Sequence, residues 1–290
     1  MDYWNASSTL MPAILRLPEY DQNRKYRLMR SQITPRKWLA LLPVLALSTL
    51  SATAAPLPPV VEYSLQKVAF QIGETKIHAQ VRQFGTNSLT MVNVHDDENA
   101  SVEAGVAVLE KTGGRLIELT HTGKRRVAFK LNGREYHFDP NRIFSSAGVR
   151  LTLKGEGGGD VPPAAYAAVD KFADQFIGHF KLDQQPAFIT LHNNGDGGLS
   201  IHTYEPGGAW EADTDELHVS STVDPDDFYF VTDKRIFDEL KKRDANVILQ
   251  DNSIKRDDGS LSVFAGRHGI PYINVEAQPD HLEEQIKMIE

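Results

Sequence analysis

The sequence predicts a single α/β domain with a mixed, mostly parallel central sheet that is flanked by helices. Short apolar runs, several of them rich in β-branched and aromatic residues, alternate along the chain with segments whose apolar residues recur at helical spacing. Turns that contain glycine or proline separate many of these elements, and the sequence shows no internal repeat or second domain. Strands that alternate with helices are typical of α/β proteins, in which helices cover the sheet.

The first half of this domain is expected to be mainly extended. A hairpin is predicted where Gly73-Glu74-Thr75 separates two strand-like runs. A helix is predicted to begin at Asn99 and to end before Gly113-Gly114, because glycine commonly follows the last helical turn. The expected strands are 66–72, 76–84, 89–94, 115–119, 127–131 and 136–138, and the expected helix is 99–111.

The second half is expected to follow a glycine-rich loop over 155–163. This loop lacks the Lys-Ser/Thr pair of a phosphate-binding loop. The segment after it places Val169, Phe172 and Phe176 on one helical face. The remaining expected helices are 164–180, 233–242 and 281–289, and the remaining strands are 187–191, 228–231, 246–249, 261–264 and 272–275.

The N-terminal region has the pattern of a secretory signal peptide. A basic pair at 36–37 precedes a mostly apolar stretch over 38–50, and Ala52-Thr53-Ala54 follows as a small-x-small cleavage site. We therefore expect a signal peptide over 29–54, a mature catalytic domain over 55–290, and a periplasmic or secreted location. Residues 1–28 are predicted to be a non-native or wrongly assigned extension, so the start is open between Met1 and Met29. The alternative is an uncleaved anchor, although a transmembrane helix needs about 20 apolar residues.

Composition narrows the classes of function. The 290 residues include no cysteine, which excludes disulfides, thiolate metal ligands and a cysteine nucleophile. Any metal must therefore be held by His, Asp or Glu. The formal net charge of −8 argues against a broad nucleic-acid surface. We expect no nucleic-acid partner, and no membrane span in the mature form.

Three candidate functional side chains stand at strand ends. His95, His192 and Glu276 each come directly after one of the predicted apolar strands. In open α/β sheets, functional sites gather at the carboxyl ends of the strands. We therefore expect these three residues to share one site.

His95 also begins a His-x-x-Glu pair with Glu98. At a strand-to-helix turn both side chains can reach one cation, and His192 completes a set of two histidines and one carboxylate. Such a set is a standard Zn²⁺ shell in catalytic sites, with an open position for water. On its own the spacing more often describes a polar loop, and Asp96 or Asp97 is an alternative carboxylate ligand.

The order of these and later residues resembles the zinc carboxypeptidase superfamily, nearest to its succinylglutamate desuccinylase/aspartoacylase branch. That branch has His-x-x-Glu, then an Arg, then Asp-Leu-Asn-Arg-x-Phe, then a His after a strand and a Glu near the end. The likeness covers roughly residues 88–277. The matching residues are His95, Glu98, Arg134, Asp139-Pro140-Asn141-Arg142-Ile143-Phe144, His192 and Glu276.

The resemblance implies a catalytic role for several of these residues. His95, Glu98 and His192 would hold Zn²⁺. Glu276 would act as the general acid and base. Arg134 would stabilise the oxyanion of the tetrahedral intermediate.

The resemblance also implies a substrate-binding group. Asn141 and Arg142 would bind a substrate carboxylate, and Asp139 would orient Arg142. Tyr204 is a candidate substrate contact from its residue type, although a packed aromatic side chain is the simpler interpretation.

Together these features predict an exported zinc-dependent hydrolase of the carboxypeptidase or N-acyl amino acid amidohydrolase type. It would cleave an amide bond beside a free carboxylate, in a small peptide or an N-acyl amino acid. Its predicted location makes cell-wall peptides a candidate substrate class. The chain departs from the family pattern at Asp96-Asp97, where Gly-Asn is common, and at Pro140, where Leu is usual. The alternative is a non-catalytic ligand-binding member of the same fold.

Overall fold

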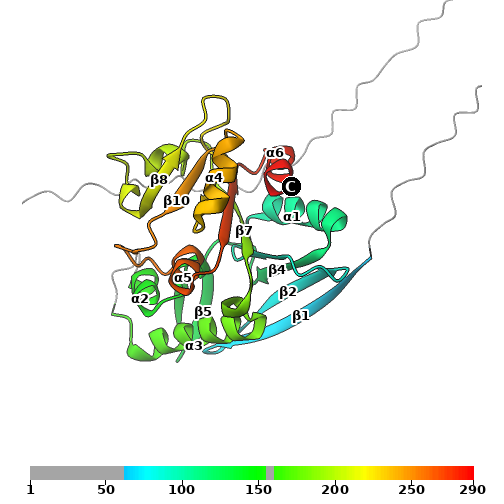
Figure 1. Ribbon diagram of the computed structural model, residues 1–290. Coiled ribbons are helices and arrows are strands. Elements are labelled where there is room, and N and C mark those ends of the chain that lie inside the picture. The colour runs from blue at the N-terminus through cyan, green and yellow to red at the C-terminus, as the bar shows by residue number, and fades with distance from the viewer. Residues whose placement is uncertain (1–61, 155–159) are drawn as a thin grey trace, which may run out of the picture. The chain divides into compact units, whose positions relative to one another are not determined.

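A nine-stranded mixed sheet forms the centre of the computed structural model, which describes residues 62–154 and 160–290 (Figure 1). The strands lie in the order β1-β2-β4-β3-β7-β11-β9-β10-β8, and a separate hairpin is formed by β5 and β6. The strands are β1 (Tyr63–Ile72), β2 (Thr75–Phe84), β3 (Thr90–Asn93), β4 (Gly114–Thr120), β5 (Val127–Leu131), β6 (Arg134–Phe138), β7 (Phe188–Asn193), β8 (Thr214–His218), β9 (Phe228–Val231), β10 (Val247–Gln250) and β11 (Tyr272–Ala277).

The middle of the sheet is parallel. Strands β4, β3, β7 and β11 are neighbours and run in the same direction. Antiparallel pairs join β1 to β2, β2 to β4, β11 to β9 and β10 to β8. The predicted α/β domain with a mixed sheet is confirmed, and its central strands align their carboxyl ends at one edge.

Helices cover both faces of this sheet (Figure 1). One core layer contains side chains of α2, α3 and α5, and the other contains side chains of α1, α4 and α6. Phe70 of β1, for example, packs against Phe172 and Phe176 of α3 with ring centroids 5.5 and 5.9 Å apart. Burial of such a ring stabilises the fold by roughly 1.5–3 kcal/mol. The helices are α1 (Asn99–Thr112), α2 (Ser146–Lys154), α3 (Pro163–Phe180), α4 (Lys234–Lys242), α5 (Leu261–His268) and α6 (Leu282–Ile289).

The prediction of a strand at 261–264 is wrong, because these residues form the first half of α5. Three of these four residues are apolar, and so short an apolar segment fits a buried strand and a buried helix equally well. The residues at the two ends of the segment determine that it is a helix. The Ser260 side chain accepts a hydrogen bond from Val263 N, and Gly269 ends the helix in the left-handed conformation with φ 65°. Helix α2 and strand β8 were not expected from the sequence.

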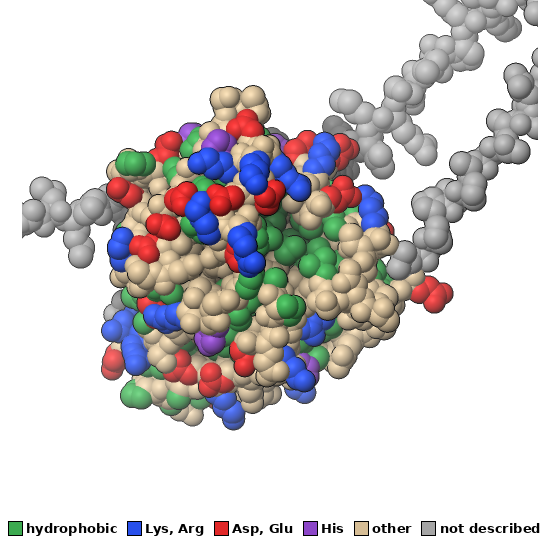
Figure 2. Space-filling view, in the orientation of Figure 1, with side chains coloured by type: hydrophobic (Ala, Val, Ile, Leu, Met, Phe, Trp, Pro, Cys, Tyr) green, Lys and Arg blue, Asp and Glu red, His purple; other side chains and the backbone are tan. Residues whose placement is uncertain are grey.

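An apolar groove lies between α4 and α6, over the sheet face. Figure 2 shows hydrophobic side chains exposed in a hollow beside a group of Lys and Arg side chains. The groove shares no residue with the predicted site. Its apolar lining includes Ile189, Tyr229, Ile236, Leu240, Ile273, Val275, Met288 and Ile289.

Some sequence predictions fall on segments that the structure does not describe. These are the N-terminal extension, the signal peptide, the residues immediately after it and most of the glycine-rich loop. Over the part of the chain that is described, no helix has both the length and the apolar character needed to cross a bilayer.

Candidate functional site

Three neighbouring parallel strands bring the candidate residues to one edge of the sheet. Strands β3, β7 and β11 are adjacent and parallel, so their carboxyl ends meet. His95 comes two residues after β3, while His192 and Glu276 are direct partners in the β7–β11 register. A turn in which Glu98 N donates to the His95 carbonyl at 3.2 Å then folds Glu98 back beside His95.

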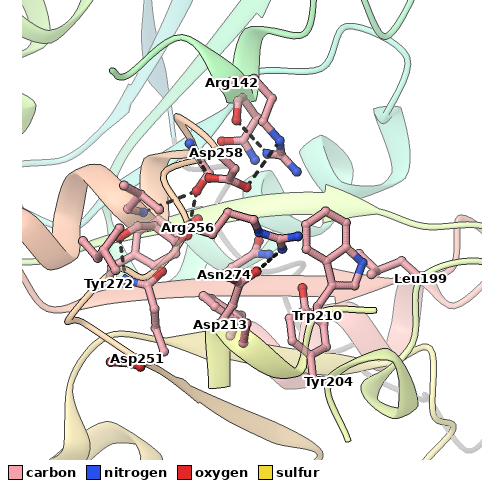
Figure 3. Close-up of a pocket in the computed structure, with 18 of the residues that line it drawn as sticks. Arg142, Leu199, Tyr204, Trp210, Asp213, Asp251, Arg256, Asp258, Tyr272 and Asn274 are labelled. Atoms are coloured by element: carbon pink, nitrogen blue, oxygen red, sulfur yellow. Dashed lines mark hydrogen bonds and ion pairs between the residues drawn. The ribbon is translucent and has the colours of Figure 1, made fainter. Parts of the chain in front are cut away.

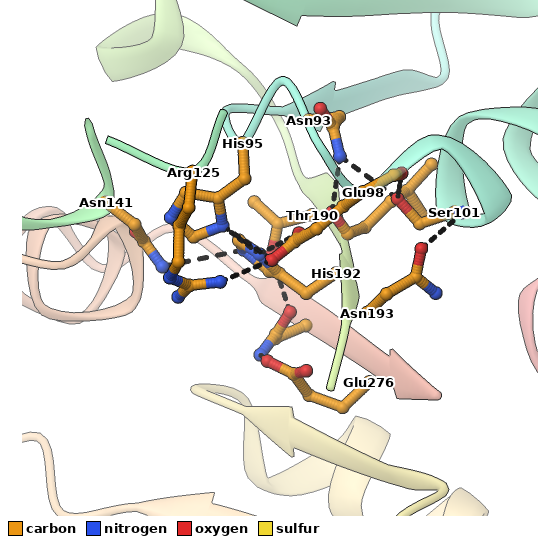
Figure 4. A network of polar contacts seen from close by, with 12 residues as sticks. Asn93, His95, Glu98, Ser101, Arg125, Asn141, Thr190, His192, Asn193 and Glu276 are labelled. Carbon is orange, nitrogen blue, oxygen red and sulfur yellow. Dashed lines mark hydrogen bonds and ion pairs between the residues drawn. The ribbon is translucent and has the colours of Figure 1, made fainter. Parts of the chain in front are cut away.

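His95, Glu98 and His192 form a compact buried cluster (Figure 4). The two Nδ1 atoms of the histidines are 3.1 Å apart, and each lies near a Glu98 oxygen, at 2.8 Å for His95 and 2.9 Å for His192. Donors placed 2.0–2.1 Å from a tetrahedral ion are separated by about 3.3 Å. The three donor atoms therefore stand close to the spacing of ligands around one cation. Among residues 62–154 and 160–290, this is the one group of three His, Asp or Glu side chains with such geometry.

Asp139 fixes the orientation of the His95 ring. Its Oδ1 atom lies 2.9 Å from Nε2 of His95, so this ring nitrogen donates and Nδ1 faces Glu98 and His192. Asp139 is itself held at the start of a short helix, η1 (Pro140–Arg142), where its side chain accepts from Asn141 N at 2.8 Å. The expectation that Asp139 orients Arg142 is therefore replaced: Asp139 orients a metal-ligand candidate.

The charges of the cluster are strongly coupled. Burial alone would lower the pKa of His95, but the Glu98 carboxylate outweighs it, and the pKa of His95 is raised to about 9. Burial would raise the pKa of Glu98, but the charges of His95 and His192 hold it well below its usual range. The Glu98 carboxylate and the His95 imidazolium therefore stabilise each other's charged form.

Glu276 lies beside this cluster on β11 and is only 7% exposed. Its Oε1 atom accepts a hydrogen bond from Nδ2 of Asn274 at 3.0 Å. Burial raises the pKa of Glu276 above its ordinary value, and the negative charge of Glu98 adds to this effect, while His192 opposes it. A carboxyl group with a raised pKa can exchange protons nearer to neutral pH.

The arginine at the cluster is Arg125, which the sequence did not single out. Its Nη1 atom is 2.6 Å from Glu98 Oε1, and its Nε atom is 3.7 Å from Asp139 Oδ2. Arg125 is on the loop between β4 and β5, where no periodic pattern marks a residue as functional. A basic residue between the His-x-x-Glu pair and the Asp139 run was the available signal, and two arginines and a lysine at 124–126 satisfied it as well as Arg134 did.

Arg134 is not brought to the cluster, which corrects its predicted place in the site. It begins β6, it is exposed, and its guanidinium stacks over the Tyr136 ring at 5.2 Å from the centroid. Strand β6 runs from Arg134 to Phe138, so Arg134 is about 16 Å along the strand from Asp139. The extended backbone thus carries the predicted arginine away from His95.

Asn141 and Arg142 lie where the sequence placed them, beside the cluster. Asn141 Oδ1 accepts a hydrogen bond from Leu261 N at 3.0 Å, which leaves its Nδ2 atom facing Nε2 of His192 at 3.5 Å. The Arg142 Nη1 atom donates to the Asn141 carbonyl at 2.7 Å, and its Nε atom is 3.4 Å from Asp258 Oδ2. The remaining guanidinium N–H groups can bind a ligand oxygen.

His192 and Glu276 line one end of a pocket, and loop residues form its wall. Figure 3 shows several of the wall residues, among them Trp210, Asp213 and Arg256. Tyr204 lines the pocket from a short helix, η3 (Ile201–Tyr204), with its ring packed against Phe228 and Phe230 at 5.8 and 5.4 Å between centroids. In the same wall, the Arg256 guanidinium lies 4.0 Å from the centroid of the Trp210 ring and forms an ion pair with Asp213. The pocket therefore has a buried charged end and a half-exposed amphipathic wall. The further lining residues include Arg125, Asn141, Arg142, Leu199, Asp258, Tyr272 and Asn274.

The sequence matches no protein-family model and no curated protein. Among solved structures, it is similar to an aspartoacylase family protein of Mesorhizobium loti, with 12% identity, a TM-score of 0.35 and coverage of 78% of this chain and 66% of that chain. It is also similar to a carboxypeptidase-like protein of Burkholderia mallei, with 10% identity, a TM-score of 0.36 and coverage of 74% of this chain and 55% of that chain. A third similar structure is an aminopeptidase of Legionella pneumophila, with 10% identity, a TM-score of 0.32 and coverage of 73% of this chain and 47% of that chain. The chain spans between about half and two thirds of the length of these proteins.

Proposed function

We propose that this protein is a zinc-dependent hydrolase that cleaves an amide bond beside a free carboxylate. One observation carries the proposal: two histidine Nδ1 atoms and the Glu98 carboxylate converge within 2.8–3.1 Å of one another, next to the buried carboxyl group of Glu276. A metallohydrolase needs a buried set of metal ligands and, beside it, a second carboxyl group that does not bind the metal.

The donor set fits Zn²⁺. Two Nδ1 atoms with lone pairs facing each other at 3.1 Å repel unless a proton or a cation lies between them. Imidazole nitrogen and carboxylate oxygen are zinc ligands, and a set of three leaves a position for water. His95, Glu98 and His192 would hold the ion, which when bound supplies Lewis acidity to the substrate carbonyl and to water.

Glu276 supplies the proton-transfer group in this proposal. It lies directly opposite His192 in the β7–β11 register and lines the same pocket. Its raised pKa suits a general base that takes a proton from the attacking water and later gives it to the leaving amine. The Asn274 amide bonds one carboxylate oxygen and leaves the other for this task.

Arg125 takes the role that the resemblance had implied for Arg134. Its guanidinium is held at the metal-ligand candidates by Glu98 and Asp139, and these carboxylates raise its pKa although burial opposes them. A fixed cation at this place would stabilise the negative charge that develops on the carbonyl oxygen.

Arg142 and Asn141 define the substrate class. Both line the pocket a short way from the cluster, and a guanidinium that is oriented by Asp258 is well suited to bind a carboxylate. We therefore infer a small peptide or an N-acyl amino acid as substrate. The amphipathic wall of Tyr204, Trp210 and Arg256 would contact the rest of that substrate.

Export is a separate part of the proposal and depends on the sequence of residues 29–54. If this segment is a cleaved signal peptide, exported protein begins at Ala55, and peptides of the cell wall are within its reach. N-terminal sequencing of the exported protein tests this. A chain that still begins at Met29 would favour an anchor.

Metal analysis and hydrolysis assays test the enzyme itself. Purified protein should contain close to one zinc ion per chain, should hydrolyse members of a panel of N-acyl amino acids and short peptides, and should lose activity with a chelator and regain it with zinc. Substrates whose carboxylate is amidated are the matched control and should react poorly. Stoichiometric zinc without any hydrolysis would favour the non-catalytic alternative.

A further inference from the structure

Asp96 departs from the motif that the sequence resembles, and it makes a specific contact in the structure. It directly follows His95 in the turn after β3. Its Oδ2 atom accepts hydrogen bonds from the backbone N–H groups of His121 and Gly123, each at 2.6 Å. Short hydrogen bonds to an ionised carboxylate are about twice as strong as neutral ones. Asp96 therefore ties the turn of the metal-ligand candidates to the loop after β4.

That loop, residues 121–126, carries Arg125. It contains no helix or strand, and most of its residues are exposed, so backbone ladders do not fix its position. Asp96 anchors its first half. Arg126 anchors its end by donating Nη2 to the Thr152 carbonyl at 2.9 Å. Arg125 lies between these two anchors, half-exposed, with its guanidinium on Glu98.

We propose that Asp96 is a positioning residue that holds this loop so that the Arg125 guanidinium faces the metal-ligand candidates. The proposal rests on the proposed function, in which Arg125 stabilises developing negative charge. One turn thus sets the place of His95 directly and the place of Arg125 through two backbone amides. Glycine at this position, as in the motif, has no side chain with which to make such a contact.

Substitutions at Asp96 separate positioning from metal binding. Asp96→Ala removes the acceptor, and in zinc-loaded protein it should lower kcat about 10- to 100-fold, the usual cost of an ångström-scale misplacement. KM and zinc content should change little, because no ligand and no carboxylate-binding group is lost. Asp96→Asn keeps an acceptor oxygen of the same size and should recover most of kcat.

A matched control is Asp233→Ala. Asp233 also accepts a hydrogen bond from a backbone N–H, that of Arg235 at 2.8 Å, but it caps α4 and does not line the pocket. This variant should lower the melting temperature and leave kcat unchanged. A loss of kcat in Asp96→Ala that Asp233→Ala does not share therefore excludes a general effect on stability.

A double-mutant cycle tests whether Asp96 affects kcat through Arg125. In an Arg125→Ala background, Asp96→Ala should cause no further loss of kcat. An equal loss in both backgrounds, or parental kcat in Asp96→Ala, overturns the proposal.

Hydrogen exchange gives a readout that does not need activity. The amides of His121 and Gly123 should exchange faster in Asp96→Ala than in the parent and in Asp233→Ala. If the parent hydrolyses no substrate, the proposed function fails, and the exchange rates still decide whether Asp96 holds the loop. Unchanged exchange would overturn that role.

Discussion

The two ends of the pocket are built in different ways. At the inner end, His95, Glu98, His192 and Glu276 are between 1% and 7% exposed and come from strand ends or the turn next to one. At the outer end, Arg142, Asp213, Arg256 and Asp258 have side chains between 19% and 40% exposed, and loops or short helices carry them.

In the proposed function, this difference separates the residues that carry out the chemistry from those that bind the substrate. The register of three buried strands fixes the inner residues, so few alternative arrangements exist for them. Ion pairs in partly exposed loops fix the outer residues, and such pairs are worth only about 0–1 kcal/mol each. Inner substitutions should therefore affect turnover severely, while outer ones should affect substrate binding and should be tolerated better.

His192→Ala should have the largest effect. It removes one of three donors, so bound zinc should fall sharply and turnover should be abolished. The fold should survive, because the change is at the end of β7 rather than in its apolar core. Metal analysis and activity assays check this. His137→Ala, which removes an exposed histidine paired with Glu135, should leave both unchanged. Equal zinc in the two variants would reject His192 as a ligand.

Glu276→Gln should come next. The amide keeps the size of the side chain but cannot accept the proton, so kcat should fall about 10²–10⁴-fold. Zinc content and KM should stay close to those of the parent. Steady-state kinetics with a thermal melt check this, and normal turnover would remove the general-base assignment.

Arg125→Ala should lower kcat about 10²–10³-fold, which is the usual cost of removing one donor to an oxyanion. Arg134→Ala is its matched control and should have nearly parental kinetics, since Arg134 contacts the Tyr136 ring on an exposed strand. The reverse result would restore the role that the resemblance implied for Arg134. Kinetic constants for both variants decide between the two arginines.

The contrast between these two arginines also shows how much of the site can be predicted from the sequence. Apolar runs that end in His95, His192 or Glu276 predict buried parallel strands, and strand ends in such sheets meet by geometry. Arg125 could not be found this way, because its position depends on a loop held by Asp96 through contacts 25 and 27 residues apart in the chain. The strand predicted at 261–264 failed for a different, local reason: the Ser260 cap, rather than the apolar residues that follow it, determines a helix there.

Arg142→Ala should mainly raise KM, by about 10- to 150-fold, since a hydrogen bond to a charged group is worth about 1.5–3 kcal/mol. The guanidinium attracts the carboxylate in both the ground and transition states, so kcat should change less. The increase in KM should shrink for amidated substrates. An unchanged KM for substrates with a free carboxylate would mean that Arg142 only forms an ion pair with Asp258 and does not bind the substrate.

The smallest effect on activity is expected from Gly148→Ala, which acts on the outer end without altering any polar group. Gly148 is in α2, and a Cβ atom there would lie 2.4 Å from Gly259 Cα and 2.6 Å from the Arg142 carbonyl oxygen. The backbone must therefore move apart where Arg142 and Asp258 are held together. We expect a loss of about 1–3 kcal/mol in the free energy of unfolding, as for other overpacked sites, and a rise in KM of a few-fold.

Gly178→Ala is the matched control for this variant. Gly178 lies in α3, where nothing approaches the added methyl group within 4 Å, so the substitution should stabilise the helix by about 0.5–1 kcal/mol and leave KM unchanged. Zinc content should be parental in both variants, because strands β3 and β7 hold the ligand candidates independently of the contact between α2 and Gly259. Thermal melts, metal analysis and kinetics measure all three quantities. A Gly148→Ala protein that loses zinc would show that the inner and outer ends of the pocket are one mechanical unit rather than two.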